Sequence, residues 1–184
     1  MTLGIEQNTD VNTNGVGLGA VRLIQLGSVI VTIENNGTVT TTAGGAANVF
    51  LDSTGAAPNT SLMTVWNYPT GAITADNREG MRVSTSGVGN NASVRAVNHG
   101  TITSGLSDHA VRAEINNNNS TGNMTLANTG TIIQRGGYTD YGVSGFQGGF
   151  GTISFNNNGT IDAQTGANRG GGVSISTGQS ARTA

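Results

Sequence analysis

The sequence contains no cysteine and no lysine among its 184 residues, and it has only two prolines. Without cysteine, neither a disulfide framework nor a thiolate metal site is available to the chain. Charged residues make up 10% of the sequence and aromatic residues 4%. The eight arginines are spread singly among ten acidic residues, so there is no basic stripe and nucleic acid is not an expected partner.

Long apolar runs are missing as well. No stretch approaches the roughly 18 apolar residues that a membrane helix requires, so we expect no membrane insertion by this segment. The first residues, Met1–Glu6, lack the basic and apolar regions of a signal peptide. Low hydrophobicity would suit a disordered chain, but the net charge is only -2 and Val, Ile and Thr are plentiful. This composition favours an ordered β protein.

A repeat of about 30 residues organises most of the chain. Its clearest copy is Val94–Ser104, and a degenerate copy begins at Val65. Each copy contains an anchor glycine, and successive anchors are 34, 29, 30 and 29 residues apart: Gly37, Gly71, Gly100, Gly130 and Gly159. A period in this range predicts a solenoid, because one repeat cannot bury its apolar side alone and must stack on its neighbours.

Alignment on the anchor glycines produces apolar columns. Two residues after the glycine stand Val39, Ile73, Ile102, Ile132 and Ile161. Six residues before it stand Val31, Val65, Val94, Met124 and Ile153, and four before it Ile33, Asn67, Ala96, Leu126 and Phe155. Strand residues two apart share a face, so both columns that precede the glycine point into one interior, with Asn67 as the exception.

A third strand is expected later in each repeat, after a loop of variable length. The candidates are Asn48–Leu51, Gly80–Val83, Ala110–Ile115, Tyr141–Ser144 and Gly172–Ile175, most of which alternate apolar with polar residues. Val21–Leu26 also reads as a strand, whereas Met1–Gly19 is polar, rich in glycine and irregular. No window carries a helical stripe, so almost no helix is expected.

Asparagine marks the corner before the glycine. Two residues before each anchor stand Asn35, Pro69, Asn98, Asn128 and Asn157. An amide both donates and accepts, so asparagines stacked about 4.8 Å apart can hydrogen-bond along the axis as a ladder. The glycine would then permit a bend that a Cβ atom obstructs. The alternative is that Asn and Gly merely mark ordinary turns.

The Asn-X-Gly-Thr-Ile units at this spacing resemble the passenger regions of bacterial autotransporter adhesins and, more loosely, filamentous haemagglutinin. The resemblance covers about Ser28 to Gly178. It implies a right-handed parallel β-helix, an architecture that the pectate-lyase family shares together with an asparagine ladder. It also implies a bacterial cell surface or extracellular location, with the parent protein anchored in the outer membrane. The absence of a secretion signal and of a translocator barrel implies an excised fragment or another export route.

Enzymatic candidates are weak. Asn8-Thr9-Asp10 matches a polygalacturonase motif by letter, but the chain has no Asp-Asp pair, no Gly-His-Gly and no Arg-X-Lys clamp. Asp108 and His109 are adjacent, so on a strand they point to opposite faces. His99 occupies the variable corner position and is expected to be exposed. Five aspartates lie at different offsets from the anchor glycine and so do not stack: Asp52, Asp76, Asp108, Asp140 and Asp162. We therefore expect no catalytic residue, no metal site and no cofactor.

Aromatic residues are the most distinctive candidates for binding. Trp66 and Tyr68 lie in the degenerate repeat, and Tyr138 and Tyr141 lie in a glycine-rich stretch. Exposed aromatics in a polar coil could stack on sugars or bind a partner. The alternative is that they fill local gaps where the coil geometry changes.

Taken together, these patterns predict an all-β, right-handed parallel β-helix of about 5–6 turns. Residues 1–27 would form an irregular segment with a first partial turn, residues 28–178 the repeats, and residues 179–184 a tail or truncated continuation. The expected function is non-enzymatic adhesion to a host surface or glycan, or self-association through the ends or faces of the helix. Two alternatives stay open: a pectin-lyase-like polysaccharide lyase or hydrolase, and a fibre subunit that polymerises.

Overall fold

The computed structural model describes residues 1–5, 10–13, 21–25, 30–41, 49–53, 59–76, 78–105, 109–135, 140–163 and 171–178. Within these ranges the chain forms eighteen strands and no helix. These residues therefore include no helix that could span a membrane. The composition explains this, since glycine and β-branched residues lower helix propensity and the β-branched residues fit a pleated surface.

The strands form three parallel sheets of six strands each. Sheet A contains β1 (Thr2–Ile5), β4 (Val31–Asn35), β7 (Leu62–Asn67), β10 (Ser93–Asn98), β13 (Met124–Asn128) and β16 (Ile153–Asn157). Sheet B contains β2 (Asp10–Thr13), β5 (Thr38–Thr41), β8 (Ala72–Ala75), β11 (Thr101–Ser104), β14 (Thr131–Gln134) and β17 (Thr160–Ala163). Sheet C contains β3 (Val21–Gln25), β6 (Val49–Ser53), β9 (Met81–Thr85), β12 (Val111–Ile115), β15 (Tyr141–Gln147) and β18 (Gly171–Thr177).

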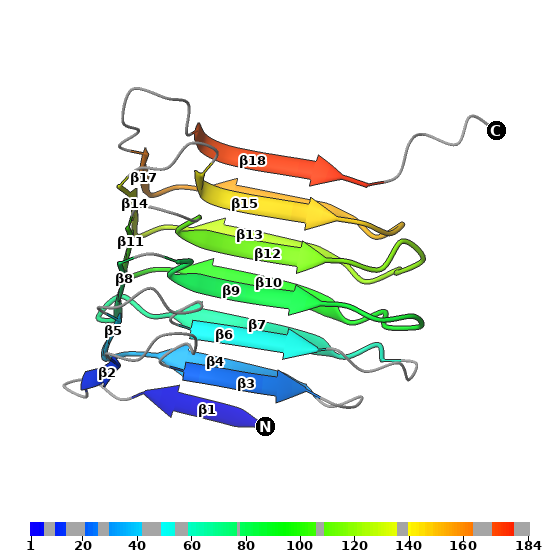
Figure 1. Cartoon of the computed structure of the whole chain (residues 1–184), viewed down its shortest axis with the longest axis horizontal. Coiled ribbons are helices and arrows are strands. Elements are labelled where there is room, and N and C mark those ends of the chain that lie inside the picture. The colour runs from blue at the N-terminus through cyan, green and yellow to red at the C-terminus, as the bar shows by residue number, and fades with distance from the viewer. Residues whose placement is uncertain are drawn as a thin grey trace.

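Each coil of the chain contributes one strand to each sheet in the order A, B, C. Figure 1 shows the coils stacked from β1 to β18, with the strands of sheet C in front running opposite to those of sheet A behind. Followed from the N-terminus upward, this path is right-handed, as connections between parallel strands of one sheet almost always are. The structure therefore confirms the predicted fold: an all-β parallel solenoid with a repeat of about 30 residues.

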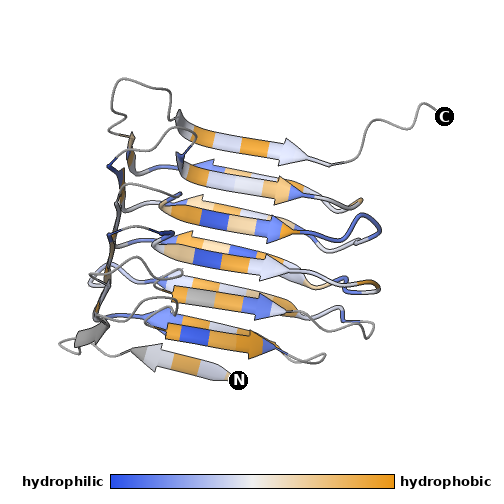
Figure 2. Ribbon diagram, in the orientation of Figure 1, coloured by the Kyte–Doolittle hydropathy of each residue, from blue (hydrophilic) through white to orange (hydrophobic). Residues whose placement is uncertain are grey.

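The apolar columns line the interior as predicted. Val94 pairs with Met124, Ala96 with Leu126, and Ile102 with Ile132. The core consists of these residues and their register partners, all nearly inaccessible to solvent through the central coils. Figure 2 shows apolar and polar residues alternating along the strands of sheet C, as expected when one face packs inward.

The degenerate repeat is corrected by the structure. Val65 pairs with Ile33 and Ala96 rather than with Val31 and Val94, so the alignment on Gly71 was wrong by two residues before the corner. The two extra residues, Pro69 and Thr70, lie in an exposed turn. The register of β7 is set by burial of one face, since a shift by one residue would turn its apolar side chains outward. The two inserted residues are therefore accommodated in the turn and not in the strand. Asn67 consequently stands where Pro69 was expected.

The N-terminal segment also differs from the expected irregular stretch. Its described residues form β1 and β2 in addition to β3, which corresponds to the strand predicted at Val21–Leu26, and the three strands pair with β4, β5 and β6 respectively. Ile5 is the register partner of Asn35, so the first coil lacks the corner asparagine that marks the other copies. Residues 179–184, expected as a tail, lie outside the described part of the chain.

Candidate functional site

The corner asparagines between sheets A and B form one continuous chain of side-chain hydrogen bonds. Each Nδ2 atom donates to the Oδ1 atom of the next coil, over 2.8 Å from Asn35 to Asn67, 2.8 Å from Asn67 to Asn98, 2.8 Å from Asn98 to Asn128 and 2.7 Å from Asn128 to Asn157. Asn98 is 1% exposed. A buried amide with both ends bonded stabilises the stack and leaves nothing to offer a ligand.

The corner glycines are required by a close approach between coils. A Cβ atom on Gly100 would lie 2.1 Å from the carbonyl oxygen of Gly71, and one on Gly130 would lie 2.1 Å from that of Gly100. Gly159 meets Gly130 in the same way, at 2.2 Å. Among the described residues, the glycines with positive φ are instead Gly87 and Gly89. Gly37 donates its N–H to Asn35 Oδ1 over 3.2 Å.

A second buried polar column lies at the opposite corner, where sheet C turns into sheet A. Asn59 Nδ2 donates to Gln25 Oε1 over 3.0 Å, and Asn90 Nδ2 donates to Ser53 Oγ over 2.9 Å. Gln147 Nε2 donates to the carbonyl oxygen of Gly122 over 2.7 Å. Sequence reasoning missed this column because the turns that carry it differ in length. Its members are bonded to one another and to the backbone, so this corner is also scaffold.

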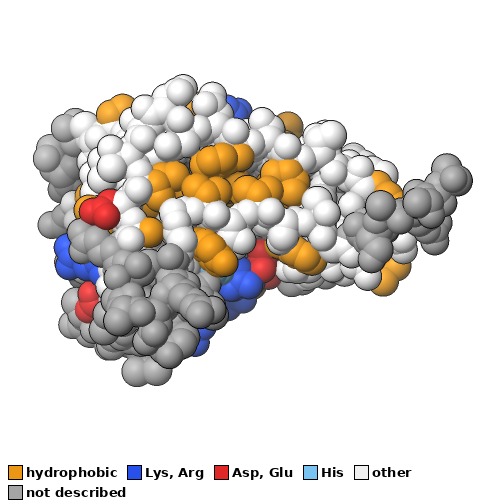
Figure 3. All heavy atoms as spheres, turned by 90° about the horizontal axis from the view of Figure 1, so that it is seen from above, with side chains coloured by type: hydrophobic (Ala, Val, Ile, Leu, Met, Phe, Trp, Pro, Cys, Tyr) orange, Lys and Arg blue, Asp and Glu red, His pale blue; other side chains and the backbone are white. Residues whose placement is uncertain are grey.

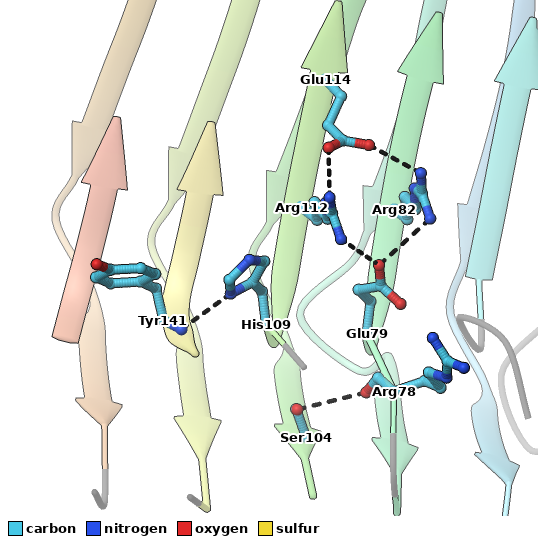
Figure 4. A network of polar contacts seen from close by, with 8 residues as sticks. All are labelled: Arg78, Glu79, Arg82, Ser104, His109, Arg112, Glu114 and Tyr141. Atoms are coloured by element: carbon cyan, nitrogen blue, oxygen red, sulfur yellow. Dashed lines mark hydrogen bonds and ion pairs between the residues drawn. The ribbon is translucent and has the colours of Figure 1, made fainter. Parts of the chain in front are cut away.

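Four charged residues form a closed network on the outer face of sheet C (Figure 4). Glu79 accepts from Arg82 over 3.4 Å and from Arg112 over 3.2 Å, and Glu114 accepts from the same arginines over 2.8 Å and 2.6 Å. Arg82 and Arg112 are register partners on β9 and β12, which places like charges side by side. The two carboxylates, with side chains 2% and 9% exposed, neutralise that pair.

His109, just before β12, contacts Tyr141 at the start of β15. His109 Nδ1 accepts the backbone N–H of Tyr141 over 3.0 Å, and their ring centroids are 5.7 Å apart. Figure 4 shows His109 pointing toward β15, away from the charged network. Asp108, the suggested partner of His109, lies outside the described residues, as do Asn8 and Thr9. Asp10 begins β2.

Trp66 and Tyr68 lie together on the outer face of sheet A with two residues of the next coil. The Trp66 and Tyr68 rings are stacked, with centroids 5.6 Å apart and planes 21° apart. The ring centroids of His99 and Trp66 are 5.5 Å apart, and the Arg95 guanidinium carbon lies 5.0 Å from the centre of the Trp66 ring. His99 is half-buried rather than fully exposed, and its Nδ1 atom contacts Thr129 Oγ1. We call Trp66, Tyr68, Arg95 and His99 the aromatic cluster.

The four aromatic residues predicted as a binding surface are therefore divided. Trp66 and Tyr68 lie together on sheet A, and Tyr141 lies on sheet C. Tyr138 lies outside the described residues. In the part of the chain that the structure describes, no three or more His, Cys, Asp or Glu side chains gather in a group that could hold a metal ion.

One open surface groove of about 290 Å³ lies beside the turns after β9 and β12. Its lining residues are Gly87, Val88 and Asn116–Asn119, so it presents amides and backbone atoms. A second cavity, in the core between Ala96, Leu126 and Phe155, holds only about 10 Å³, about one water molecule. Around these three residues the core is therefore close-packed.

Comparison with models of protein families, with curated proteins and with solved structures finds no match. The parallel β-solenoid is the part of the sequence resemblance that the structure supports. What the solenoid does must be argued from its own surfaces.

Proposed function

We propose that this chain is a non-enzymatic segment of a secreted or surface-exposed bacterial β-helix, of the kind found in autotransporter adhesin passengers, and that it acts in adhesion or self-association. The polar residues at the two corners of successive coils support this proposal because they are bonded inside the scaffold. Side chains that are hydrogen-bonded between coils in this way stabilise a rigid rod. A rod presents long, regular surfaces to a partner or to another rod.

The observation that supports self-association is the apolar face of the last described coil, a surface that either a second copy or a further coil of the same chain would bury. Seen from that end in Figure 3, hydrophobic side chains gather in the middle of the surface, where the core is otherwise covered by the next coil. Val173 and Ile175 of β18 are 40% and 38% exposed, and Ile153, Phe155 and Ile161 are only partly buried. Apolar surface of this kind is stabilised by further burial.

The first and last described coils are compatible with head-to-tail stacking. Phe155 ends the inward column that begins at Leu3, and Ile175 ends the column that begins at Leu23. Among the described strands, β16, β17 and β18 each pair on one side only, and their other edges could bond to β1, β2 and β3 of a second copy. A further coil in register would therefore extend all three sheets and the core together.

The test is assembly of the purified chain, measured by sedimentation velocity and electron microscopy over a range of concentrations. The wild type is expected to form rods whose mass grows with concentration. Ile175→Lys should abolish growth because it places a charge in the stacking plane, whereas Val88→Lys, at a turn residue that is 82% exposed, should assemble normally. A wild type that stays monomeric throughout, or an Ile175→Lys variant that assembles equally well, would refute self-association through this end.

The same apolar face of the last described coil supports the fibre alternative. Regular, unbranched filaments of constant width in the micrographs would favour a polymerising subunit. Short rods of a few copies would favour an adhesive segment.

A further inference from the structure

The open groove beside the turns after β9 and β12 has the size and polarity of a site for a small ligand. Its volume of about 290 Å³ lies close to the lower end of the range of roughly 300–1,000 Å³ that is typical of such sites. Figure 2 shows the turn after β12 as hydrophilic along most of its length. None of the described residues that line the groove is charged, so its chemistry favours an uncharged ligand.

Buried asparagines hold both walls of the groove in place. Asn90 fixes the first wall, because its Nδ2 atom donates to the carbonyl oxygen of Ser86 over 3.1 Å and to Ser53 Oγ over 2.9 Å. Asn117 joins the two walls: its Nδ2 atom donates to the carbonyl oxygen of Asn90 over 3.0 Å, and its Oδ1 atom accepts the backbone N–H of Asn119 over 3.0 Å. A groove with fixed walls binds a ligand at a lower ordering cost.

Two exposed asparagines leave their side-chain amides open to the groove. Asn116 donates its backbone N–H to the Thr85 carbonyl oxygen over 2.8 Å, and Asn119 donates its own to Asn117. Both side chains line the groove, and neither amide is bonded to another described residue. Each amide carries a donor group beside an acceptor. Neighbouring hydroxyl groups, or an amide of the ligand, match this arrangement.

Val88 supplies the apolar part of the lining. Its side chain is 82% exposed, and it lies between Gly87 and Gly89, whose φ angles are 100° and 80°. Glycine adopts such angles without strain, so the turn can present the valine at the edge of the groove. Contact with a methyl group of a ligand would remove this apolar surface from water.

An extended peptide fits the groove less well than a sugar does. Such a peptide binds by pairing its backbone with an open strand edge. The residues that line the groove all lie in turns, and the backbone N–H groups of Asn116 and Ser120 already donate within the chain. Side-chain amides and one apolar contact remain. A pyranose with an acetamido group matches both, because it carries hydroxyls, an amide and a methyl group.

We propose that this groove is a binding subsite for an uncharged saccharide that carries an acetamido group. The hydroxyl and amide groups of the sugar exchange hydrogen bonds with Asn116 and Asn119, and its acetyl methyl group contacts Val88. This inference names the ligand class of the adhesive surface and rests on the proposed adhesive role. It requires no assembly, because the groove lies beside the central coils, on the side of the rod.

The test is an NMR titration of the isotope-labelled Ile175→Lys chain, which is expected to be monomeric. The chain is titrated with N,N′-diacetylchitobiose and, separately, with cellobiose, which has the same length and linkage but no acetamido group. We expect saturable shifts of the asparagine side-chain signals in the turns after β9 and β12 with the acetylated sugar. Cellobiose should bind about threefold more weakly or less well still. Salt should change neither affinity, because the ligands and the groove lining are uncharged.

Asn119→Ala should weaken binding of the acetylated sugar about threefold to tenfold, since it removes one or two hydrogen bonds. Asn158→Ala is the matched control, because it makes the same change at an exposed asparagine of another corner. Val88→Ser should reduce the preference for the acetylated sugar over cellobiose by removing the apolar contact.

Three results would each overturn the subsite: no saturable shift, equal affinity for the two sugars, or equal affinity in Asn119→Ala and Asn158→Ala. Binding by a chain that never forms rods would support the subsite and defeat self-association alone. Rods without binding would defeat only this inference.

Discussion

The asparagine ladder allows a sharp test of what holds the coils together. Asn98 lies in the middle of the ladder, accepts from Asn67 over 2.8 Å and donates to Asn128 over 2.8 Å. In Asn98→Ala, Asn128 Oδ1 loses its ladder donor, while Asn67 Nδ2 keeps only longer contacts, of which the shorter is 3.2 Å to the Gly71 carbonyl. An orphaned buried polar group costs about 1–3 kcal/mol. One full loss and one partial loss therefore predict destabilisation by about 2–4 kcal/mol.

The matched control is Asn157→Ala, the same change at the end of the same ladder. Asn157 is exposed, so water can replace its bonds, and we expect a cost below about 1 kcal/mol. Asn98→Asp provides a second comparison: it can still accept from Asn67, but it opposes a carboxylate oxygen to Asn128 Oδ1. It should therefore be at least as destabilising as alanine at neutral pH.

Equilibrium unfolding in urea, followed by far-ultraviolet circular dichroism, measures these differences. Solenoids can lose coils in steps, so the slope of the free energy of unfolding against urea must be compared between variants. Equal slopes allow the midpoints to be converted to free energies. If Asn98→Ala costs no more than Asn157→Ala, then the buried ladder does not stabilise the stack and the reasoning is wrong.

Three further changes test other contacts. Gly100→Ala should destabilise the chain by about 3 kcal/mol or more, because its Cβ would meet the Gly71 carbonyl oxygen at 2.1 Å, whereas Gly172→Ala, whose nearest contact is 4.0 Å, should be nearly neutral; thermal unfolding separates them. Glu79→Gln should lower the free energy of unfolding by about 2 kcal/mol, less than for a fully buried ion pair because the arginines are 28–29% exposed. In urea unfolding, high salt should reduce the difference in stability between this variant and the wild type. Gln147→Leu should cost about 1–3 kcal/mol by removing the donor to the Gly122 carbonyl oxygen, with faster hydrogen exchange in β15 as a second measure.

The fold was predictable because each inward position recurs in every coil. A column such as Val39, Ile73, Ile102 and Ile132 leaves only one face that can be buried, and the constant period then requires neighbouring coils to stack. Where a copy lost its marker residue, prediction failed. Ile5 replaces the corner asparagine in the first coil, and the insertion of Pro69 and Thr70 displaced Asn67 from its expected column.

The surface contacts were less predictable because they join residues from different coils. Arg82 and Arg112 are 30 positions apart, and only the register of β9 with β12 makes them neighbours that need Glu79 and Glu114 between them. The sequence identified Trp66 and Tyr68 of the aromatic cluster as candidate binding residues, but it did not identify Arg95. Its place over the indole follows from the corrected register of β7, which no single repeat reveals.

The coiled topology has a consequence for how the chain folds. Each strand pairs with one about 30 residues away, roughly a sixth of the 184-residue chain, whichever coil it belongs to. The entropy lost on closing each loop is thus nearly the same for every coil and would not grow if more coils were added. The first pair of coils to form must overcome the highest barrier, and every later coil then adds to an existing edge. Folding should therefore start wherever the core residues are largest and spread in both directions, at a rate set by that first pair rather than by the length of the rod.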